Sequence, residues 1–231
     1  MTVDLNQAPE QGTGAGPIPE DSVVIVVAEI RPPKAGKEGT THPLFCKSSS
    51  SPYEYLDFEF TVISTKFKDR KIWQNFMLSF TSNAPTEKSN QAIGISMRTL
   101  RAMVEAARKI SPKDASPAAT AARIINDFSD LNAMLFPVVV GCEWGKPNNE
   151  GKRYLNNTIK RIVTPDDERF AKVFADPEGA IISDKPFPPE PATAAAGSAK
   201  PTWAAPAATK AEAKTAPLPG VNATPKPAWA K

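Results

Sequence analysis

The amino-acid sequence predicts a mainly β fold with some α-helix. It comprises five strands, a helical insertion between the third and fourth of them, and a disordered C-terminal tail. Three observations predict it. Five apolar runs have the alternation or the β-branched composition of strands. The segment between the third and fourth runs has helical spacing. After residue 183 the composition shifts to alanine, proline, threonine and lysine.

The sequence divides into three parts. Residues 1–19 are rich in glycine and proline and poor in apolar residues, which is typical of a flexible arm. Residues 20–183 contain every predicted strand and helix, so we expect them to form one domain. Residues 184–231 lack the apolar content needed to fold and are predicted to be disordered. No apolar run reaches membrane-spanning length and no signal-peptide pattern is present, so we expect a soluble, cytoplasmic protein.

The first predicted strand, residues 22–30 (SVVIVVAEI), is strongly β-branched and is expected to be buried on both faces. A long loop at 31–52 follows, rich in proline, glycine and serine. Loops of this length are usually functional or disordered. The loop is locally basic, because a single acid, Glu38, faces four cations. These cations are Arg31, Lys34, Lys37 and Lys47.

Residues 53–80 are predicted to form a long β-hairpin around which the domain is organised. In each strand apolar residues alternate with polar ones, so one face is buried and the other, called the wet face below, is exposed to solvent. Gln74 interrupts the apolar face of the second strand. The turn at 66–70 (KFKDR) carries three cations and one anion. The apolar faces comprise Leu56, Phe58, Phe60 and Val62 in the first strand, and Ile72, Phe76, Leu78 and Phe80 in the second.

Trp73 is the informative residue of the hairpin, because the alternation places it on the wet face beside Lys71. An indole there can stack on a nucleic-acid base while neighbouring cations meet phosphates. Alternatively, Trp73 covers a second apolar layer, because large aromatic side chains usually bury most of their area. Both interpretations remain open at this point.

The second half of the domain mixes helices and strands. Residues 81–95 are expected to be polar loop that ends in a short extended piece. Ser96 can cap a helix that runs to about residue 110, and Ser116-Pro117 has the cap-then-proline pattern of a second helix start. The remaining elements are strands at 136–144 and 154–163, a turn-rich basic loop at 145–153 between them, and a helix from Thr164-Pro165 to about Phe174.

This order of elements matches an OB-fold, a five-stranded barrel with a helical connection between its third and fourth strands. An OB-fold binds oligomers on strands two and three, helped by the loops that join strands 1–2 and 4–5. Both loops are basic here, and Trp73 and the basic turn belong to strands two and three. An α+β roll has the same elements and remains the alternative.

The charge distribution limits where nucleic acid can bind. The net charge is +3, all of it from residues 184–231, so residues 1–183 are formally neutral and any binding surface must be local. We therefore predict that ssDNA binds through the aromatics and cations of the basic segments. These residues are Trp73, Lys66, Phe67, Lys68, Arg70, Lys71, Tyr55, Lys34, Lys37, Lys47, Lys146, Lys152, Arg153, Tyr154 and Lys160.

Three segments resemble phage-encoded single-stranded DNA-binding proteins of replication and recombination modules. They are residues 55–79, the run SMRTLRAMVEAARKI, and the run FPVVVGCEWGKPNNEGKRYLNNTIKRI. The resemblance covers about two-thirds of the chain and lies in element order and local pattern. It implies an OB-like fold, sequence-tolerant ssDNA binding in the host cytoplasm and no catalytic site. One departure is the basic tail, because many proteins of this kind end in an acidic tail that recruits partners.

The sequence offers little for other chemistry. Asp57 and Glu59 share a strand face and could bind a metal in a nuclease, but the sequence places no third carboxylate beside them. Cys46, Cys142 and His42 form neither a disulfide framework nor a metal-ligand set. We therefore expect that the protein has no enzymatic activity and binds neither a metal nor a cofactor. The alternative function is a phage interaction or adaptor module without nucleic-acid binding.

The tail contains the pattern K-P-x-W-A twice, at residues 200–204 and 226–230. Prolines hold the flanks extended, which lowers the entropy lost on docking, and a tryptophan can fill a pocket as an anchor. The sequence thus suggests that Trp203 and Trp229 bind a replication or recombination partner.

Overall fold

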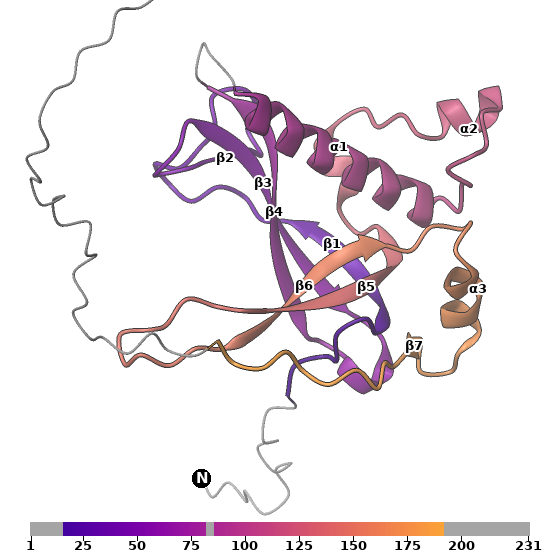
Figure 1. Cartoon of the computed structure of the whole chain (residues 1–231). Helices are drawn as coiled ribbons and strands as arrows, with labels where there is room; N and C mark the ends of the chain where they lie inside the picture. Colours follow the sequence, from indigo (N-terminus) through magenta and orange to yellow (C-terminus); the bar gives the residue numbers. More distant parts are fainter. Residues whose placement is uncertain (1–15, 82–85, 192–231) are drawn as a thin grey trace, which may run out of the picture. The chain divides into compact units, whose positions relative to one another are not determined.

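The computed structural model describes residues 16–81 and 86–191, which form an antiparallel sheet with helices around it (Figure 1). The prediction of a mainly β fold with some α-helix is confirmed. The long strands are β1 (Val23–Ile30), β3 (Tyr53–Val62), β4 (Lys71–Phe80), β5 (Leu135–Trp144) and β6 (Leu155–Ile162), and the two-residue strands are β2 (Cys46–Lys47) and β7 (Ala180–Ile181).

The long strands follow the path β4–β3–β1–β5–β6, and each neighbouring pair is antiparallel. The short β2 pairs with β3, and the short β7 pairs with β1. β4 and β6 are the two ends of the path. They approach each other, but within the described residues no backbone ladder joins them, so the sheet is not closed.

The inner face of the sheet forms the hydrophobic core. The alternation predicted for the hairpin is confirmed in β3 by the complete burial of Leu56, Phe58, Phe60 and Val62. In β4 it holds for Ile72 and Phe76, which are buried, but not for the end of the strand, where Leu78 and Phe80 are only half-buried. The ring of Phe60 packs edge-on against Phe136 and Phe76, with centroid distances of 6.2 and 6.4 Å. Each large side chain buried in this way stabilises the fold by about 1.5–3 kcal/mol.

The long loop before the hairpin is tied to it through Glu54. This carboxylate is fully buried and accepts hydrogen bonds from the backbone and hydroxyl groups of Thr40 and Thr41. Burial alone would raise the pKa of Glu54, but these hydrogen bonds outweigh it and hold the pKa below its usual value. The loop also contains β2, which sequence periodicity could not reveal because it is two residues long.

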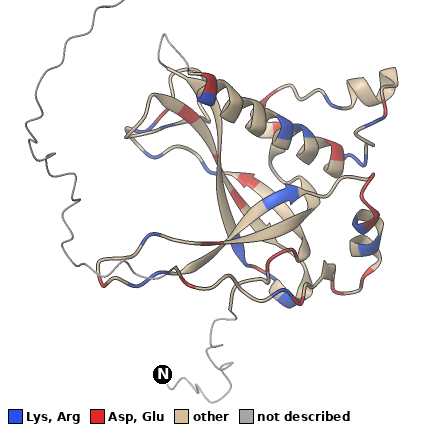
Figure 2. Cartoon of the chain, in the orientation of Figure 1, with Lys and Arg blue, Asp and Glu red and all other residues tan. Residues whose placement is uncertain are grey.

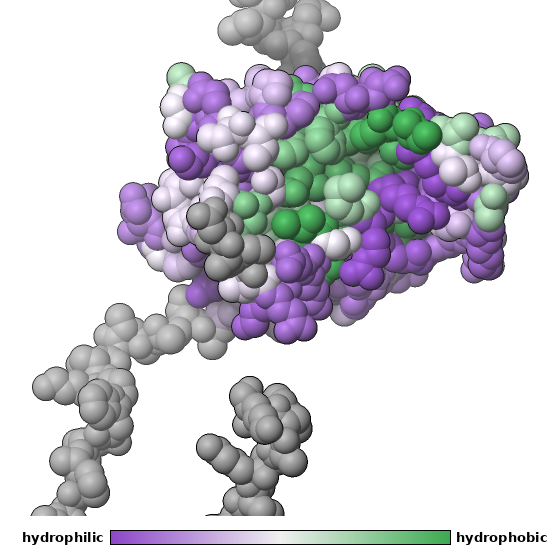
Figure 3. Space-filling view, turned by 90° about the horizontal axis from the view of Figure 1, so that it is seen from above, coloured by the Kyte–Doolittle hydropathy of each residue, from purple (hydrophilic) through white to green (hydrophobic). Residues whose placement is uncertain are grey.

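The first helix, α1 (Glu87–Ala107), begins ten residues earlier than predicted. Thr86 is its N-cap and accepts a hydrogen bond from the amide of Ser89, whereas Ser96 is buried inside the helix. The expected extended piece before Ser96 is therefore wrong. α1 packs against β4, β5 and β6, and it leaves about half of Ile95 and of Met97 exposed, at 51% and 52%. The face of the domain shown in Figure 3 carries a contiguous apolar area that is surrounded by hydrophilic residues.

Two other helices start or end differently from the prediction. α2 (Pro117–Ala121) starts as expected at Ser116-Pro117 and stops after five residues. Just beyond its end, Arg108 Nη1 donates to the carbonyls of Ala122 and Ile124 at 2.7 and 2.9 Å. α3 (Glu168–Ala175) is capped by Asp167 and not by the threonine before the proline. The remaining helical turns are η1 (Thr65–Phe67) and η2 (Phe128–Leu131). Among the described residues no helix is both long and apolar enough to cross a membrane.

The described ends of the chain lie against the sheet. Ile18 belongs to the segment predicted as an arm, but it is fully buried and exchanges two hydrogen bonds of 2.9 Å with the side chain of Asn157. At the other end, Lys185 forms ion pairs with Glu20 and Asp21 at 2.8 and 3.1 Å. The segment from 184 to 191 therefore lies on the domain. The rest of the predicted tail, and residues 1–15 of the arm, lie outside the described residues.

Candidate nucleic-acid interface

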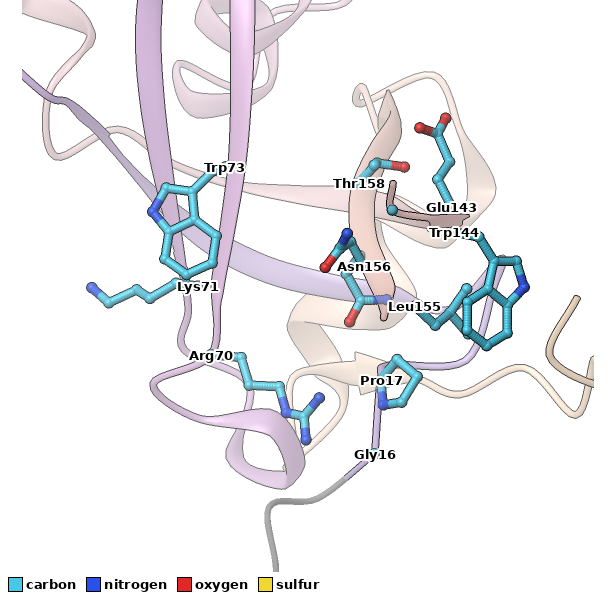
Figure 4. A pocket seen from close by; sticks show the side chains of 12 residues that line it. Gly16, Pro17, Arg70, Lys71, Trp73, Glu143, Trp144, Leu155, Asn156 and Thr158 are labelled. Atoms are coloured by element: carbon cyan, nitrogen blue, oxygen red, sulfur yellow. The ribbon is translucent and has the colours of Figure 1, made fainter. Parts of the chain in front are cut away.

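A cleft of about 700 Å³ opens at the seam where β4 and β6 fail to pair (Figure 4). β4 and the turn before it provide one wall, and β6 with the end of β5 provides the other. The segment at Gly16–Pro17 lies at the lower edge in the view of Figure 4. The lining residues are Gly16, Pro17, Arg70, Lys71, Trp73, Glu143, Trp144, Gly145, Leu155, Asn156, Asn157 and Thr158.

Trp73 lines this cleft and exposes 54% of its surface, so it lies on the wet face, as the alternation predicts. Its Nε1 donates to Glu59 Oε2 at 3.0 Å. Lys71 Nζ binds Glu59 Oε1 at 2.7 Å and donates to Thr61 Oγ1 at 2.6 Å. The contacts with Lys71 and then Trp73 lower the pKa of the Glu59 carboxyl, so this acid is ionised at neutral pH. Glu59 thus holds the indole and the ammonium side by side.

The basic turn contributes to the cleft unevenly. Lys66 and Lys68 are exposed. Phe67 is buried in the core, so the prediction that it contacts nucleic acid is wrong. The reason is the helical turn η1, which directs this ring inward. The guanidinium of Arg70 lies over the Phe67 ring, 5.7 Å from its centroid, and lines the cleft. Burial lowers the pKa of Arg70, but arginine remains cationic at any physiological pH.

The opposite wall has uncharged polar side chains at its centre, Asn156 and Thr158 of β6. Gly141 of β5 and Gly145, just after the end of β5, make room for them. A Cβ at Gly141 would lie 2.7 Å from Thr158 Oγ1, and a Cβ at Gly145 would lie 2.9 Å from Asn156 Nδ2. Both positions therefore exclude any larger residue while these side chains stay in place. Beside them lies Trp144, whose Nε1 donates to the carbonyl of Pro188 at 3.1 Å.

A second cleft, of about 520 Å³, lies at the base of the β1–β3 loop and contains several predicted residues. It is lined by Lys34, Lys37 and Tyr55, together with Arg31, whose Nη2 binds the Asp57 carboxylate at 2.6 and 2.7 Å. Lys47 is exposed in the adjoining β2. Tyr55 and Trp73 lie four residue pairs apart in the β3–β4 register. The two aromatics are therefore about 13 Å apart along one face of the hairpin.

The loop between β5 and β6 holds the next group of predicted residues. Lys146, Lys152 and Tyr154 are exposed, and Lys152 pairs with Glu150 at 3.3 Å. Arg153 is half-buried, and its Nε has no hydrogen-bond partner within the described chain. In Figure 1 this loop and the β1–β3 loop project to the same side of the sheet.

Lys160 lines neither of the two clefts and is already engaged in ion pairs. Its Nζ binds Asp21 at 2.7 Å and Glu20 at 3.3 Å, and these contacts raise its pKa. Its positive charge is thus already compensated by two carboxylates.

The structure therefore groups Trp73, Arg70 and Lys71 in one cleft and Lys34, Lys37 and Tyr55 in the other. Cations and anions are interspersed over the described chain (Figure 2). Trp144 and Asn156 are cleft residues that the sequence argument missed. The glycines at 141 and 145, where a Cβ would meet a polar side chain of β6, are the signal that could have pointed to them.

No group of three or more histidine, cysteine, aspartate or glutamate side chains suited to a metal occurs among the described residues. The acids considered for a nuclease, Asp57 and Glu59, are each paired with a cation. Burial raises the pKa of both thiols, Cys46 and Cys142.

Comparison with known proteins adds little. No protein-family model and no curated protein matches the chain. A chain of the solved structure titled "Yeast RPA bound to ssDNA" aligns with a TM-score of 0.26 and 9% identity, covering 74% of this chain and 90% of that chain. Likeness at this level carries no argument about fold or function.

Proposed function

We propose that this protein binds single-stranded DNA without catalysing a reaction, through the outer face of β3–β4 and the cleft at the β4–β6 seam. The observation that carries the proposal is a half-exposed indole, Trp73, in an open cleft beside Lys71 and Arg70. Base stacking on such an indole is tolerant of sequence, because every base has a π-face. The other wall carries no cation, because Asn156 and Thr158 are uncharged and Glu143 is an acid, so the phosphate contacts are assigned to the β4 wall.

The strand path supports an OB-like fold as part of this proposal. A partly open five-stranded barrel with its binding face on the second and third strands matches the path β4–β3–β1–β5–β6, with the two ends in proximity. By its sequence resemblance, the protein would coat or protect ssDNA during phage replication or recombination, in the host cytoplasm and without a cofactor.

The central test is titration of a labelled oligo(dT), and of a duplex of equal length, at several salt concentrations. We expect binding to oligo(dT) that weakens with salt. In the Lys66→Ala/Lys68→Ala double variant the slope of log K against log salt should flatten by about 1.4, because each lost phosphate contact to a single strand removes about 0.7. The matched control replaces two exposed lysines of other elements, Lys113 and Lys172, by alanine. A slope equally changed in both double variants would contradict contact by the turn.

The adaptor function is the second candidate, and two observations favour it. Arg31 and Lys71 on the proposed face are already paired with Asp57 and Glu59. The apolar area of Figure 3 is also the kind of surface that marks protein contacts. This candidate predicts that oligo(dT) does not bind even at low salt.

The partner role of the tail is a separate proposal, because Trp203 and Trp229 lie outside the described residues. Two copies of one docking motif raise the effective concentration at a multivalent partner. Deletion of residues 192–231 should leave oligo(dT) affinity nearly unchanged, while strand annealing or replication with the cognate partner is lost. Loss of oligo(dT) binding on deletion would instead mean that the tail holds DNA.

A further inference from the structure

Gln74 interrupts the apolar face of β4 with a polar side chain. Its hydrogen-bond partner lies on β6. In the β3–β4 register Gln74 lies opposite Phe58, and its neighbours on the same face, Ile72 and Phe76, are buried. An amide at such a position costs stability unless it is hydrogen-bonded. Gln74 Oε1 accepts a hydrogen bond from the backbone amide of Ile159 at 3.1 Å. In the described part of the chain this hydrogen bond links the two ends of the sheet.

The spacing of the seam follows from this link. Direct backbone pairing would bring β4 and β6 to about 4.8 Å from each other and close the sheet. A glutamine side chain inserted between the strands satisfies the Ile159 amide, yet keeps the backbones further apart. The cleft lies directly beside this link, because Trp73 precedes Gln74 and Thr158 precedes Ile159, and both line the cleft.

A bulge in β6 accompanies the link. The register of β5 with β6 shifts between Val139 and Val140, so that Lys160 has no partner on β5. Its side chain reaches Glu20 and Asp21 instead. Gln74 and Ile159 also line two neighbouring hollows, one of about 460 Å³ against β5 and one of about 360 Å³ that the two strands share with α1. The link therefore lies among several openings in a seam that, within the described residues, has no backbone ladder.

We propose that Gln74 is a positioning residue for nucleic acid, which sets the width of the cleft by joining β4 to β6 through its side chain. This inference rests on the proposed function. Without the link, the wall that carries Trp73 is no longer held at a fixed distance from the wall that carries Asn156 and Thr158. DNA binding then has to fix the two walls relative to each other. This ordering costs free energy, so the affinity for DNA falls.

The test compares Gln74→Met, which keeps the side-chain length but removes the acceptor, with Gln74→Glu, which keeps an acceptor oxygen. The readouts are amide hydrogen exchange at Ile159 and affinity for a labelled oligo(dT). In Gln74→Met the Ile159 amide should exchange about fivefold faster, and oligo(dT) should bind about fivefold more weakly, as expected for one lost hydrogen bond. Gln74→Glu should retain slow exchange at Ile159. The same substitution at an exposed helix position, Gln91→Met, is the control and should change neither readout.

Unchanged exchange at Ile159 in Gln74→Met would overturn the proposal. So would faster exchange combined with unaltered oligo(dT) affinity, in a protein whose Trp73→Ala variant does bind more weakly. Failure of the proposed function looks different. If the unaltered chain does not bind oligo(dT), the role of Gln74 in binding is refuted with it, while the Ile159 exchange separately shows whether the link exists.

Discussion

We expect the Trp73→Ala variant to bind oligo(dT) about 1–3 kcal/mol more weakly than the unaltered protein, because one base loses its stacking platform. The fold should be retained. The indole is half-exposed on the outer face of the hairpin, and its hydrogen bond goes to the surface carboxylate of Glu59. Fluorescence anisotropy of labelled oligo(dT) measures the affinity, and urea unfolding of the same samples measures stability.

Two further variants make this result specific. Trp73→Phe keeps an aromatic face and should lose less affinity than the alanine variant. Ile124→Ala removes a large side chain that is 64% exposed in the helical insertion, and it should leave the affinity unchanged. If Trp73→Ala lowers stability as much as it lowers affinity, the indole is a packing residue and does not serve as a stacking platform.

We expect the Glu105→Ala variant to lose about 3 kcal/mol of unfolding free energy, the lower end of the range for breaking a buried ion pair. Glu105 of α1 is 3% exposed. Its Oε1 accepts hydrogen bonds from Arg123 Nε at 2.6 Å and Arg101 Nε at 2.8 Å. Arg123 is itself largely buried, so removal of the carboxylate leaves its positive charge without a counter-charge.

Arg101→Ala is the natural comparison, because Arg101 is the exposed partner of the same carboxylate. Its removal should cost less than about 1 kcal/mol, as for surface ion pairs. Urea denaturation curves of the two variants test the difference. Equal costs for the two substitutions would show that the pair with Arg123 contributes no more than a surface contact, and that packing alone holds the helical insertion.

The strands could be predicted from the sequence because an alternation of two residues records directly which face is buried. That signal correctly placed Trp73 outside and Phe58 and Phe60 inside. The start of α1 was missed, because the stretch from 87 to 95 contains a serine, an asparagine, a glycine and two isoleucines, which are weaker helix formers than alanine. Beyond the end of α2, Arg108 takes up the carbonyls of Ala122 and Ile124, a tertiary contact that no local pattern records.

The candidate site could be predicted only in part, for a similar reason. One wall of the cleft comes from β4 and is visible in the local pattern of the hairpin. The other wall comes from β5 and β6, about seventy residues further along the chain, so Asn156 and Trp144 could not be connected with Trp73. Phe67 was misplaced because alternation ends in a turn, where the direction of a side chain depends on backbone geometry.

The central claim, that ssDNA binds at the β4–β6 seam, is tested most directly by amide hydrogen exchange of the full chain with and without saturating oligo(dT). The account predicts slower exchange in the first half of β4, around Trp73, and in the first half of β6, around Asn156. It also predicts unchanged exchange in α2 and α3. Binding that slows exchange elsewhere and leaves both of these strand segments unaffected would contradict it.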